Sequence, residues 1–314
     1  MRNLTLASVA LLLAGCAMEV VPDGAWPPSA DDEEGGEYRP YDTAGRADGF
    51  TPPEGPLVFD GACEEGDEIT IAAVGDVLLH SNLQRQAYGA SDRHHSLWRG
   101  VEDLMEQADV TYANLEGPAA AGVSKAGASV RDPGMVFDGE VYSSYPQFNY
   151  HPSLIESLLE SGVDVVSTAN NHSLDRLSLG VDRTIDALDA AGLPYTGTRR
   201  RETTEPWFTV TDVNGFRLAW LACTYSTNYI EDQRWLRAER PFLRAQVLYC
   251  FDEEEEVVAQ VRSLAASSDV DAVIVTPHWG GEYDANPNDE QVRLGHRLLD
   301  AGATAIIGSH PHVL

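Results

Sequence analysis

The sequence predicts an α/β fold in which short apolar strands alternate with helices. Residues 163–166 and 272–275 are continuous apolar runs of the kind that form buried parallel strands. Residues 177–191, which follow the first run, carry apolar side chains at helical spacing. Polar clusters rich in Asp, Asn, Glu or His follow five of the predicted strands. Because active sites of open α/β sheets lie outside the carboxyl ends of strands, we expect the functional site there.

Residues 1–16 are predicted to be a signal peptide. Arg2 precedes an apolar run over residues 4–13, which is too short to span a bilayer as a permanent helix. The tetrapeptide Leu13-Ala14-Gly15-Cys16 resembles a bacterial lipobox, in which Cys16 becomes the lipid-modified first residue. An ordinary secretory signal with a chance cysteine is the alternative. Both interpretations predict export, and the lipobox predicts a lipoprotein of the bacterial cell envelope that contacts the membrane through its lipid anchor only.

Residues 17–68 are predicted to be an acidic, disordered tether. Fifteen Asp and Glu residues lie between Glu19 and Glu68, against two arginines, and Pro and Gly are frequent. The whole chain has a net charge of −29 and a single lysine, Lys125, which argues against nucleic-acid binding. An anionic substrate would need a local positive charge, for which a bound metal ion is a candidate.

The folded domain is expected over residues 69–314. Pro152 suits the start of one predicted helix, and the acidic run over residues 252–256 suits the positive end of another helix dipole. The Asn214-Gly215 dipeptide between two apolar runs predicts a β-hairpin. Residues 119–145, rich in Gly, Ser and Pro, are expected to form an irregular surface excursion. Strands are predicted at 69–74, 110–113, 163–166, 207–211, 216–222, 272–275 and 304–307, and helices at 97–107, 152–160, 177–191, 252–266 and 291–301.

The cysteines after Cys16 show no CxxC spacing, so a cysteine zinc site is not expected. They are Cys63, Cys223 and Cys250, and an oxidising compartment would allow one disulfide and one free thiol. Cys223 and Cys250 are candidates to pair, although sequence separation does not fix their distance. The neighbouring His94 and His95 are interpreted as part of a surface loop rather than as metal ligands.

The five polar clusters together form the ligand set of a hard-to-borderline metal site. His310 and His312 can face the same pair of metal ions, because alternate residues of an extended segment point the same way. Glu116 or Asp76 could bridge two cations, while His172 would protonate a leaving group. For residues 170–172 alone, a polar turn that caps the next helix is the alternative. The clusters are Gly75-Asp76, Asn114-Leu115-Glu116, Asn170-Asn171-His172, His278-Trp279-Gly280-Gly281-Glu282 and Gly308-Ser309-His310-Pro311-His312.

In this order the five clusters, with Asp175 and Tyr283, resemble the CapA family, which is associated with poly-gamma-glutamate capsule biosynthesis. The resemblance covers about residues 69–314. It implies a calcineurin-like, metallo-dependent phosphatase fold, which is a four-layer α/β/β/α sandwich with the predicted hairpin in a second sheet. It also implies two divalent metal ions, for which Mn, Fe and Zn are candidates.

The resemblance implies a role for each matching residue. His172 matches the general acid, and Asn170 is expected to shape the turn before it. Asp175, Glu282 and Tyr283 fit the family pattern as candidate substrate contacts. Arg176 stands where the family has an aromatic residue, and its guanidinium is a candidate to bind phosphate or carboxylate, with a solvated side chain as the alternative. The matching metal ligands are Asp76, Glu116 as the bridging carboxylate, Asn171, His278, His310 and His312.

Three features depart from the superfamily pattern. Leu78 stands where the first motif has a ligand histidine, which predicts a weaker or absent metal site unless His80 compensates. Glu116 replaces an Asp and has a longer side chain, which could change the ion spacing. The chain ends at Leu314, where the family continues, so a fragment that lacks the last strands is an expectation.

The sequence leaves two functions open. The first, which it favours, is a metal-dependent hydrolase of the phosphoesterase type that acts on an envelope phosphoester or on the amide bonds of an anionic polymer such as polyglutamate. The second is a non-catalytic factor on the same fold that binds the polymer or capsule-synthase partners in the membrane. Leu78 stands where the superfamily has a ligand histidine, and this replacement supports the non-catalytic factor.

Overall fold

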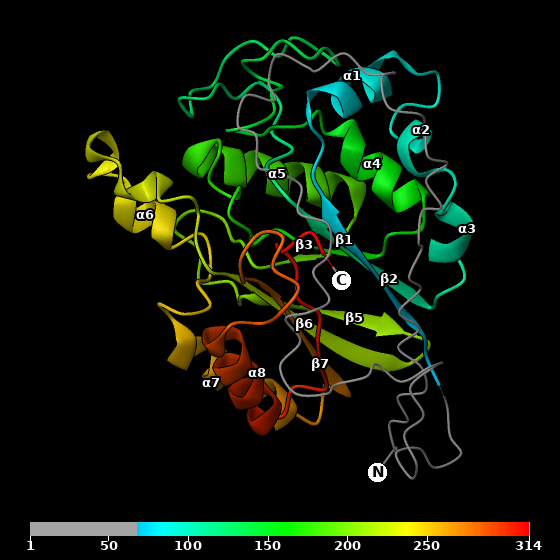
Figure 1. Ribbon diagram of the computed structural model, residues 1–314, viewed down its shortest axis with the longest axis vertical. Helices are drawn as coiled ribbons and strands as arrows, with labels where there is room; N and C mark the ends of the chain where they lie inside the picture. The colour runs from blue at the N-terminus through cyan, green and yellow to red at the C-terminus, as the bar shows by residue number, and fades with distance from the viewer. Residues whose placement is uncertain (1–67, 314) are drawn as a thin grey trace.

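The computed structural model describes residues 68–313 and contains two four-stranded sheets (Figure 1). The predicted signal peptide, Cys16 and the predicted tether up to residue 67 lie outside the described residues. The first sheet is parallel and has the order β1 (Ile71–Val77), β2 (Val110–Leu115), β3 (Val165–Ser167) and β4 (Tyr195–Thr196). The second sheet has the order β5 (Phe208–Val213), β6 (Phe216–Thr224), β7 (Ala272–His278) and β8 (Ala305–Ile306). Only β5 and β6 pair antiparallel among these strands. The mixed α/β fold with parallel strands is therefore confirmed, and the predicted hairpin lies in the second sheet.

A buried apolar cluster joins the two sheets. Tyr112 of β2 and Trp220 of β6 stack with ring centroids 5.7 Å apart and planes inclined by 6°. The Tyr112 hydroxyl donates to Ser167 Oγ at 2.8 Å, and that hydroxyl donates to Asn114 Oδ1 at 2.7 Å. The inter-sheet core is thereby connected to the polar strand ends. Its other fully buried members include Val110, Val165, Leu218 and Ile274.

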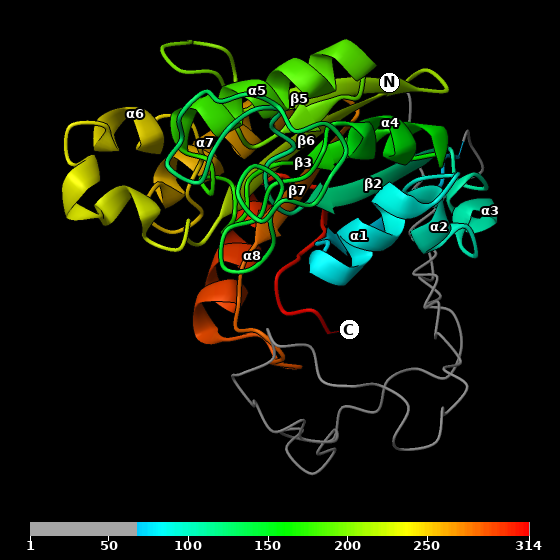
Figure 2. The same ribbon diagram turned by 90° about the horizontal axis from the view of Figure 1, so that it is seen from above.

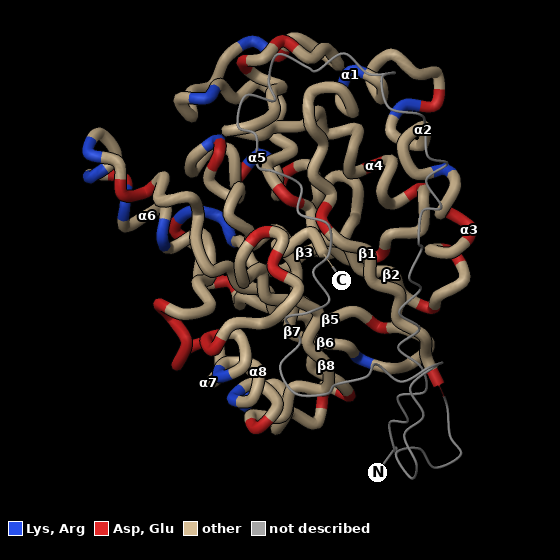
Figure 3. Tube along the Cα trace, viewed as in Figure 1, with Lys and Arg blue, Asp and Glu red and all other residues tan. Residues whose placement is uncertain are grey.

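Helices cover the outer face of each sheet (Figure 1). α4 (Ser153–Glu160) and α5 (Leu177–Ala191) contribute to apolar clusters with the first sheet, whereas α7 (Glu254–Ala265) and α8 (Asp289–Ala301) pack on the second. The acidic start of α7, red in Figure 3, pairs with α8 through contacts from Glu254 to Arg293 and Arg297. Among the described residues no helix combines the length and the apolar character that crossing a bilayer requires.

The helix predicted at 97–107 is replaced by two short helices, α2 (His95–Trp98) and α3 (Glu102–Met105). Gly100 lies between them, and glycine is a poor helix former because its backbone loses most freedom on folding. The structure also contains helices that the sequence did not predict, α1 (Ser81–Gly89) and α6 (Arg240–Arg244). Figure 2 shows α6 on the opposite side of the molecule from α1, α2 and α3.

Residues 119–145, which we call the excursion, contain no helix or named strand, as predicted. The excursion is anchored at both ends. The Asn149 side chain donates to the carbonyls of Ala120 and Val141, both at 2.8 Å, and accepts from the Ala120 amide at 2.8 Å. Residues at both ends, such as Val123 and Tyr142, are buried, so only the middle of the excursion is a surface loop.

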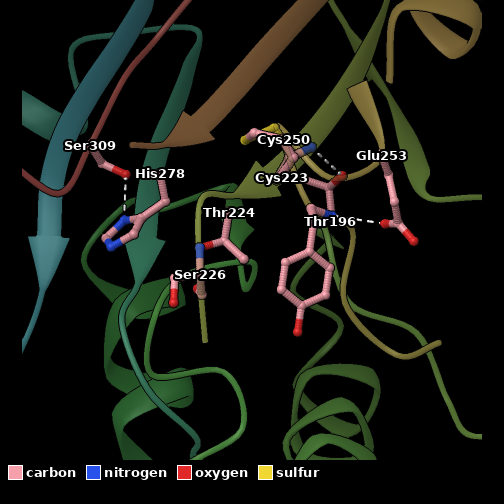
Figure 4. The surroundings of a disulfide bond; sticks show 10 residues. Thr196, Cys223, Thr224, Ser226, Cys250, Glu253, His278 and Ser309 are labelled. Atoms are coloured by element: carbon pink, nitrogen blue, oxygen red, sulfur yellow. Dashed lines mark hydrogen bonds between the residues drawn. A yellow bond between two sulfur atoms is a disulfide. The ribbon is translucent and has the colours of Figure 1, made fainter. Parts of the chain in front are cut away.

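Cys223 and Cys250, the predicted candidates, form a disulfide at the end of β6 (Figure 4). Removing it by the Cys223→Ala/Cys250→Ala double substitution is expected to lower the free energy of unfolding by about 3.5 kcal/mol, because the bond closes a loop with a sequence separation of 27 in the unfolded chain. Urea unfolding measures the change, and reduced wild type is the control, since it should lose a similar amount. A loss below about 1 kcal/mol in both would contradict this prediction.

The prediction of a surface position for His94 is wrong. His94 is 0 % exposed, and both ring nitrogens lack hydrogen-bond partners among the described residues. Its ring stacks on Trp98 at 6.2 Å and meets the Tyr88 ring edge-on at 5.8 Å. Burial, with smaller contributions from the charges of His151, Arg93 and His95, lowers the pKa of His94 to about 4.

This buried imidazole predicts a pH-dependent stability. Between the unfolded pKa of 6.5 and the folded pKa of about 4, the unfolded chain binds the proton more tightly, so stability falls as the pH falls through that window. We expect a loss of roughly 2–3 kcal/mol that the His94→Phe variant lacks. Urea unfolding at several pH values measures it. The exposed His296 on α8 offers the control, since His296→Gln should keep the wild-type profile. Parallel profiles for wild type and His94→Phe would refute the assignment.

Candidate metal centre

Side chains from the carboxyl ends of both sheets converge in one cluster. The first sheet contributes mainly oxygen atoms, and the second contributes three imidazoles. Parallel strand ends meet at one edge of a sheet, which explains why residues far apart in the sequence meet here. The members are Asp76 in β1, Glu116 after β2, Asn171 after β3, His278 at the end of β7, Glu282 in the following loop, and His310 and His312 after β8.

Three groups of side chains have possible ligand atoms within 4.8 Å of one another. Glu116 belongs to two groups, one with His278 and His310 and the other with Asp76 and His312. This is the placement that a bridging carboxylate needs. The third group joins Glu282 to His310 and His312. The sequence placed Glu282 in the ligand-rich cluster after His278, although the family resemblance implied a substrate contact for it.

Two asparagines hold the cluster together. Asn171 Oδ1 accepts from His278 Nε2 at 3.0 Å, while Asn114 Nδ2 donates to Asp76 Oδ1 at 2.7 Å and lies 3.2 Å from His278 Nδ1. In the sequence, Asn114 belonged to the cluster before Glu116 but had no predicted role of its own. Asn170 donates to the Leu115 carbonyl at 2.8 Å, which ties the turn after β3 to β2, as expected of a turn-shaping residue.

The electrostatics of the cluster suit a cation. Burial, followed by the charges of Asp76, Glu282 and Asp175, raises the pKa of Glu116 to about 9. Burial also raises the pKa of Asp76, but the hydrogen bond from His312 and the charge of His278 outweigh it and lower that pKa to about 2. Glu116 Oε2 and His310 Nδ1 are buried without a hydrogen-bond partner among the described residues. Carboxylate oxygens and imidazole nitrogens with unused lone pairs fit a borderline divalent metal.

His172 and Asp175 form a buried pair. His172 Nδ1 lies 2.8 Å from Asp175 Oδ2, which also accepts from the Phe148 amide at 2.6 Å. The Phe148 ring meets the imidazole edge-on at 4.7 Å. Asp175, expected at the substrate, is 0 % exposed and lies against the Nδ1 side of His172. Only the folded structure brings in Phe148, which carried no signal in the sequence.

Arg176 is not solvated, because it is also 0 % exposed. Its guanidinium donates to the Asp175 carbonyl at 2.9 Å, to the carbonyls of Glu140 and Val141 at 3.2 Å each, and to Ser143 Oγ at 2.5 Å. The donors therefore tie the turn after β3 to the excursion. Within the described residues this side chain is a buried anchor between two loops.

The remaining predicted residues lie around the cluster. Tyr283 is 72 % exposed, and its ring lies 6.1 Å from the His312 ring, so it can reach a bound molecule from the rim. His80, the candidate replacement for a histidine at Leu78, belongs to none of the ligand groups among the described residues. Instead its ring meets the Phe148 ring edge-on at 5.2 Å.

Comparisons with known proteins identify a family and several relatives of this chain. A family described as "Bacterial capsule synthesis protein PGA_cap" matches residues 70–314. "Capsule biosynthesis protein CapA" of Bacillus anthracis is 27% identical over 80% of this chain and 56% of its own length. "PGA biosynthesis protein CapA" of Bacillus subtilis (strain 168) is 25% identical over 79% of this chain and 58% of its own length. "Probable polyglutamine synthesis accessory protein" of Mycobacterium tuberculosis is 28% identical over 56% of this chain and 46% of its own length. The chain thus spans about half the length of these relatives.

Proposed function

The chain belongs to the PGA_cap family of bacterial capsule synthesis proteins, within the calcineurin-like superfamily, and we propose that it is a metal-dependent hydrolase of the phosphoesterase type. It acts in capsule or poly-gamma-glutamate biosynthesis, on a phosphoester or on an amide bond of the anionic polymer. The observation that carries this proposal is the convergence of Asp76, Glu116, His278, His310 and His312 beside the His172–Asp175 pair. The four-layer α/β/β/α sandwich belongs to the same proposal.

Asp76, Glu116, Asn171, His278, His310 and His312 would hold one or two divalent ions, with Mn, Fe and Zn as candidates. When bound, such ions polarise the bond to be cleaved and activate water. His172 holds a proton for the leaving group. Because Asp175 accepts from Nδ1, the protonated imidazole keeps its Nε2–H for donation. Tyr283 and Glu282 contact the substrate at the rim.

The proposal places this chemistry outside the cytoplasm. Residues 1–16 act as a lipoprotein signal peptide ending at the lipid-modified Cys16, residues 17–68 as an acidic tether, and residues 69–314 as the folded domain. The disulfide between Cys223 and Cys250 supports an oxidising compartment, where such bonds form and persist. The membrane is reached through the lipid, near the capsule-synthase partners.

The test combines metal analysis with turnover. The full chain, loaded with Mn²⁺, Fe²⁺ or Zn²⁺, is assayed on a model phosphomonoester, a model phosphodiester and polyglutamate, with EDTA-treated protein as the control. Tightly held metal and EDTA-sensitive turnover on one of these substrates are expected. Turnover on none of them would overturn the hydrolase.

The second candidate is a non-catalytic polymer-binding or synthase-assembly factor on the same fold. Leu78, which offers no ligand atom where the superfamily has a histidine, favours it. Polymer binding that EDTA leaves unchanged, with no metal bound and no turnover, would establish this alternative in place of the hydrolase.

A further inference from the structure

A cavity of about 570 Å³ lies between the start of α1 and the excursion. Its lining includes two cationic side chains, Arg85 and Lys125, and no Asp or Glu. Two other cavities, of about 530 and 480 Å³, include acidic side chains in their linings. In a chain with 50 acidic residues against 21 basic ones, a cavity lined by cations without carboxylates favours an anionic ligand.

The two cations are available for a ligand. Neither Arg85 nor Lys125 has an ion-pair partner among the described residues. The Arg85 guanidinium lies over the Phe137 ring, 4.3 Å from its centroid. A guanidinium stacked by its face keeps the N–H groups along its edges, which bind a carboxylate through two parallel hydrogen bonds. Lys125, the only lysine of the chain, adds a second positive charge.

The walls of the cavity are fixed by hydrogen bonds. Gln84 Nε2 in α1 donates to the Ser143 carbonyl at 2.9 Å, and Arg176 donates to Ser143 Oγ at 2.5 Å. Ser143 lines the cavity, so these bonds hold the excursion against both α1 and the turn after β3. The cavity is therefore formed before a ligand arrives, which lowers the entropic cost of binding.

The cavity adjoins the proposed catalytic residue. His80 lines the cavity, and its ring meets Phe148 at 5.2 Å. The Phe148 ring in turn meets the His172 ring at 4.7 Å. One phenylalanine ring thus separates the cavity wall from His172, so a chain-like substrate at His172 could extend into the cavity.

We propose that this cavity binds a carboxylate group of an anionic polymer whose reacting bond lies at His172. The inference rests on the proposed function, because it adds a subsite for the polymer beside the same catalytic residue. Arg85 and Lys125 bind the carboxylate, while Phe137 and the 69 % exposed Tyr145 pack against the methylene groups between carboxylates. A compact phosphate has no apolar part for these rings, so the lining favours a polymer of carboxylate-bearing units.

The experiment measures binding without turnover. A fluorescent γ-glutamyl oligomer is titrated with the metal-free full chain in EDTA, so that neither metal binding nor hydrolysis contributes. The Arg85→Gln/Lys125→Gln variant is expected to bind about tenfold more weakly at low salt, since it loses two charge-assisted contacts that solvent partly screens. Arg262→Gln, which removes an exposed arginine of α7, is the matched control and should bind as wild type. Circular dichroism checks that each variant is folded.

Two further probes separate the outcomes. Wild type should bind the uncharged γ-glutaminyl oligomer no more tightly than the double variant binds the γ-glutamyl oligomer. Tripolyphosphate should not compete with the γ-glutamyl oligomer for the cavity. Equal oligomer affinity in wild type and the double variant, no binding by wild type, or stronger binding of tripolyphosphate would each overturn the proposal. Binding is measured without metal, so a failed hydrolase assay would not contradict oligomer binding in the cavity. A failed binding assay would likewise not contradict the hydrolase.

Discussion

Replacement of His172 by alanine is expected to lower the turnover of the metal-loaded protein by about 10²–10⁴-fold, the usual contribution of general acid–base catalysis. In the proposed hydrolase the imidazole delivers the proton, since Asp175 contacts its Nδ1 and leaves Nε2 for the leaving group. Its removal should leave the ligand groups intact, because His172 belongs to none of them among the described residues. Steady-state kinetics measure kcat, and elemental analysis measures bound metal.

The same measurements on two other variants make the assignment specific. Asp175→Asn keeps the size of the side chain but loses the carboxylate that contacts Nδ1 and orients the imidazole, so kcat should fall while bound metal stays unchanged. His296→Gln, at an exposed site on α8, should match wild type. A His172→Ala enzyme that keeps its metal and full turnover would exclude His172 as the acid.

Glu116→Gln is expected to abolish the stabilisation that metal gives, which is about 2.7 kcal/mol for wild type at a metal concentration one hundred times Kd. Glu116 belongs to two groups of possible ligands, and the proposed site would need it to give up its proton on metal binding, which an amide side chain cannot do. The stability of the metal-free protein should change little at pH 7, because a Glu116 pKa of about 9 means that the side chain is already neutral there. Thermal unfolding with and without Mn²⁺ or Zn²⁺ measures both effects.

The pH dependence of the metal-free protein provides an independent check. Between the unfolded pKa of 4.5 and the folded pKa of about 9, the folded state binds the Glu116 proton more tightly, so the stability of wild type falls as the pH rises through this window. Glu116→Gln should lack that decline. An equal metal-induced stabilisation in wild type and variant would show that Glu116 is not a ligand.

The sequence predicted those parts of the fold that local pattern determines. β3, α5 and β7 were expected because apolar runs and helical spacing are local signals. α1 escaped prediction because it buries few apolar residues. One of its two buried side chains is Gln84, whose amide donates to Leu79 and Ser143 only in the folded chain. His94 was misplaced for a similar reason, since tertiary packing alone buries it between Tyr88 and Trp98.

The candidate site was predictable as a set but not in its pairwise contacts. Polar residues at the ends of neighbouring parallel strands lie close together, so the proximity of Asp76 to Glu116 followed from strand order within the first sheet. The approach of His278 depends in addition on how the second sheet packs against the first. Contacts between loops follow no such rule. The pairing of Asp175 with His172, the burial of Arg176 and the approach of Glu282 to His310 and His312 depend on loop conformation, which residue spacing does not encode.

The stacked rings of Tyr112 and Trp220 lie between the two sheets that supply the possible ligands of the proposed metal site. Oxygen donors stand mainly on one side of that core and imidazoles on the other, so the distance between the sheets determines whether both kinds of donor can reach one ion. A smaller side chain at Trp220 would let the two halves shift relative to each other. Mn, Fe and Zn differ in their preference for oxygen and nitrogen ligands. The preference of the site among these ions would then change without any substitution at a ligand. If the proposed site binds metal, the packing between the sheets would therefore influence which ion it prefers.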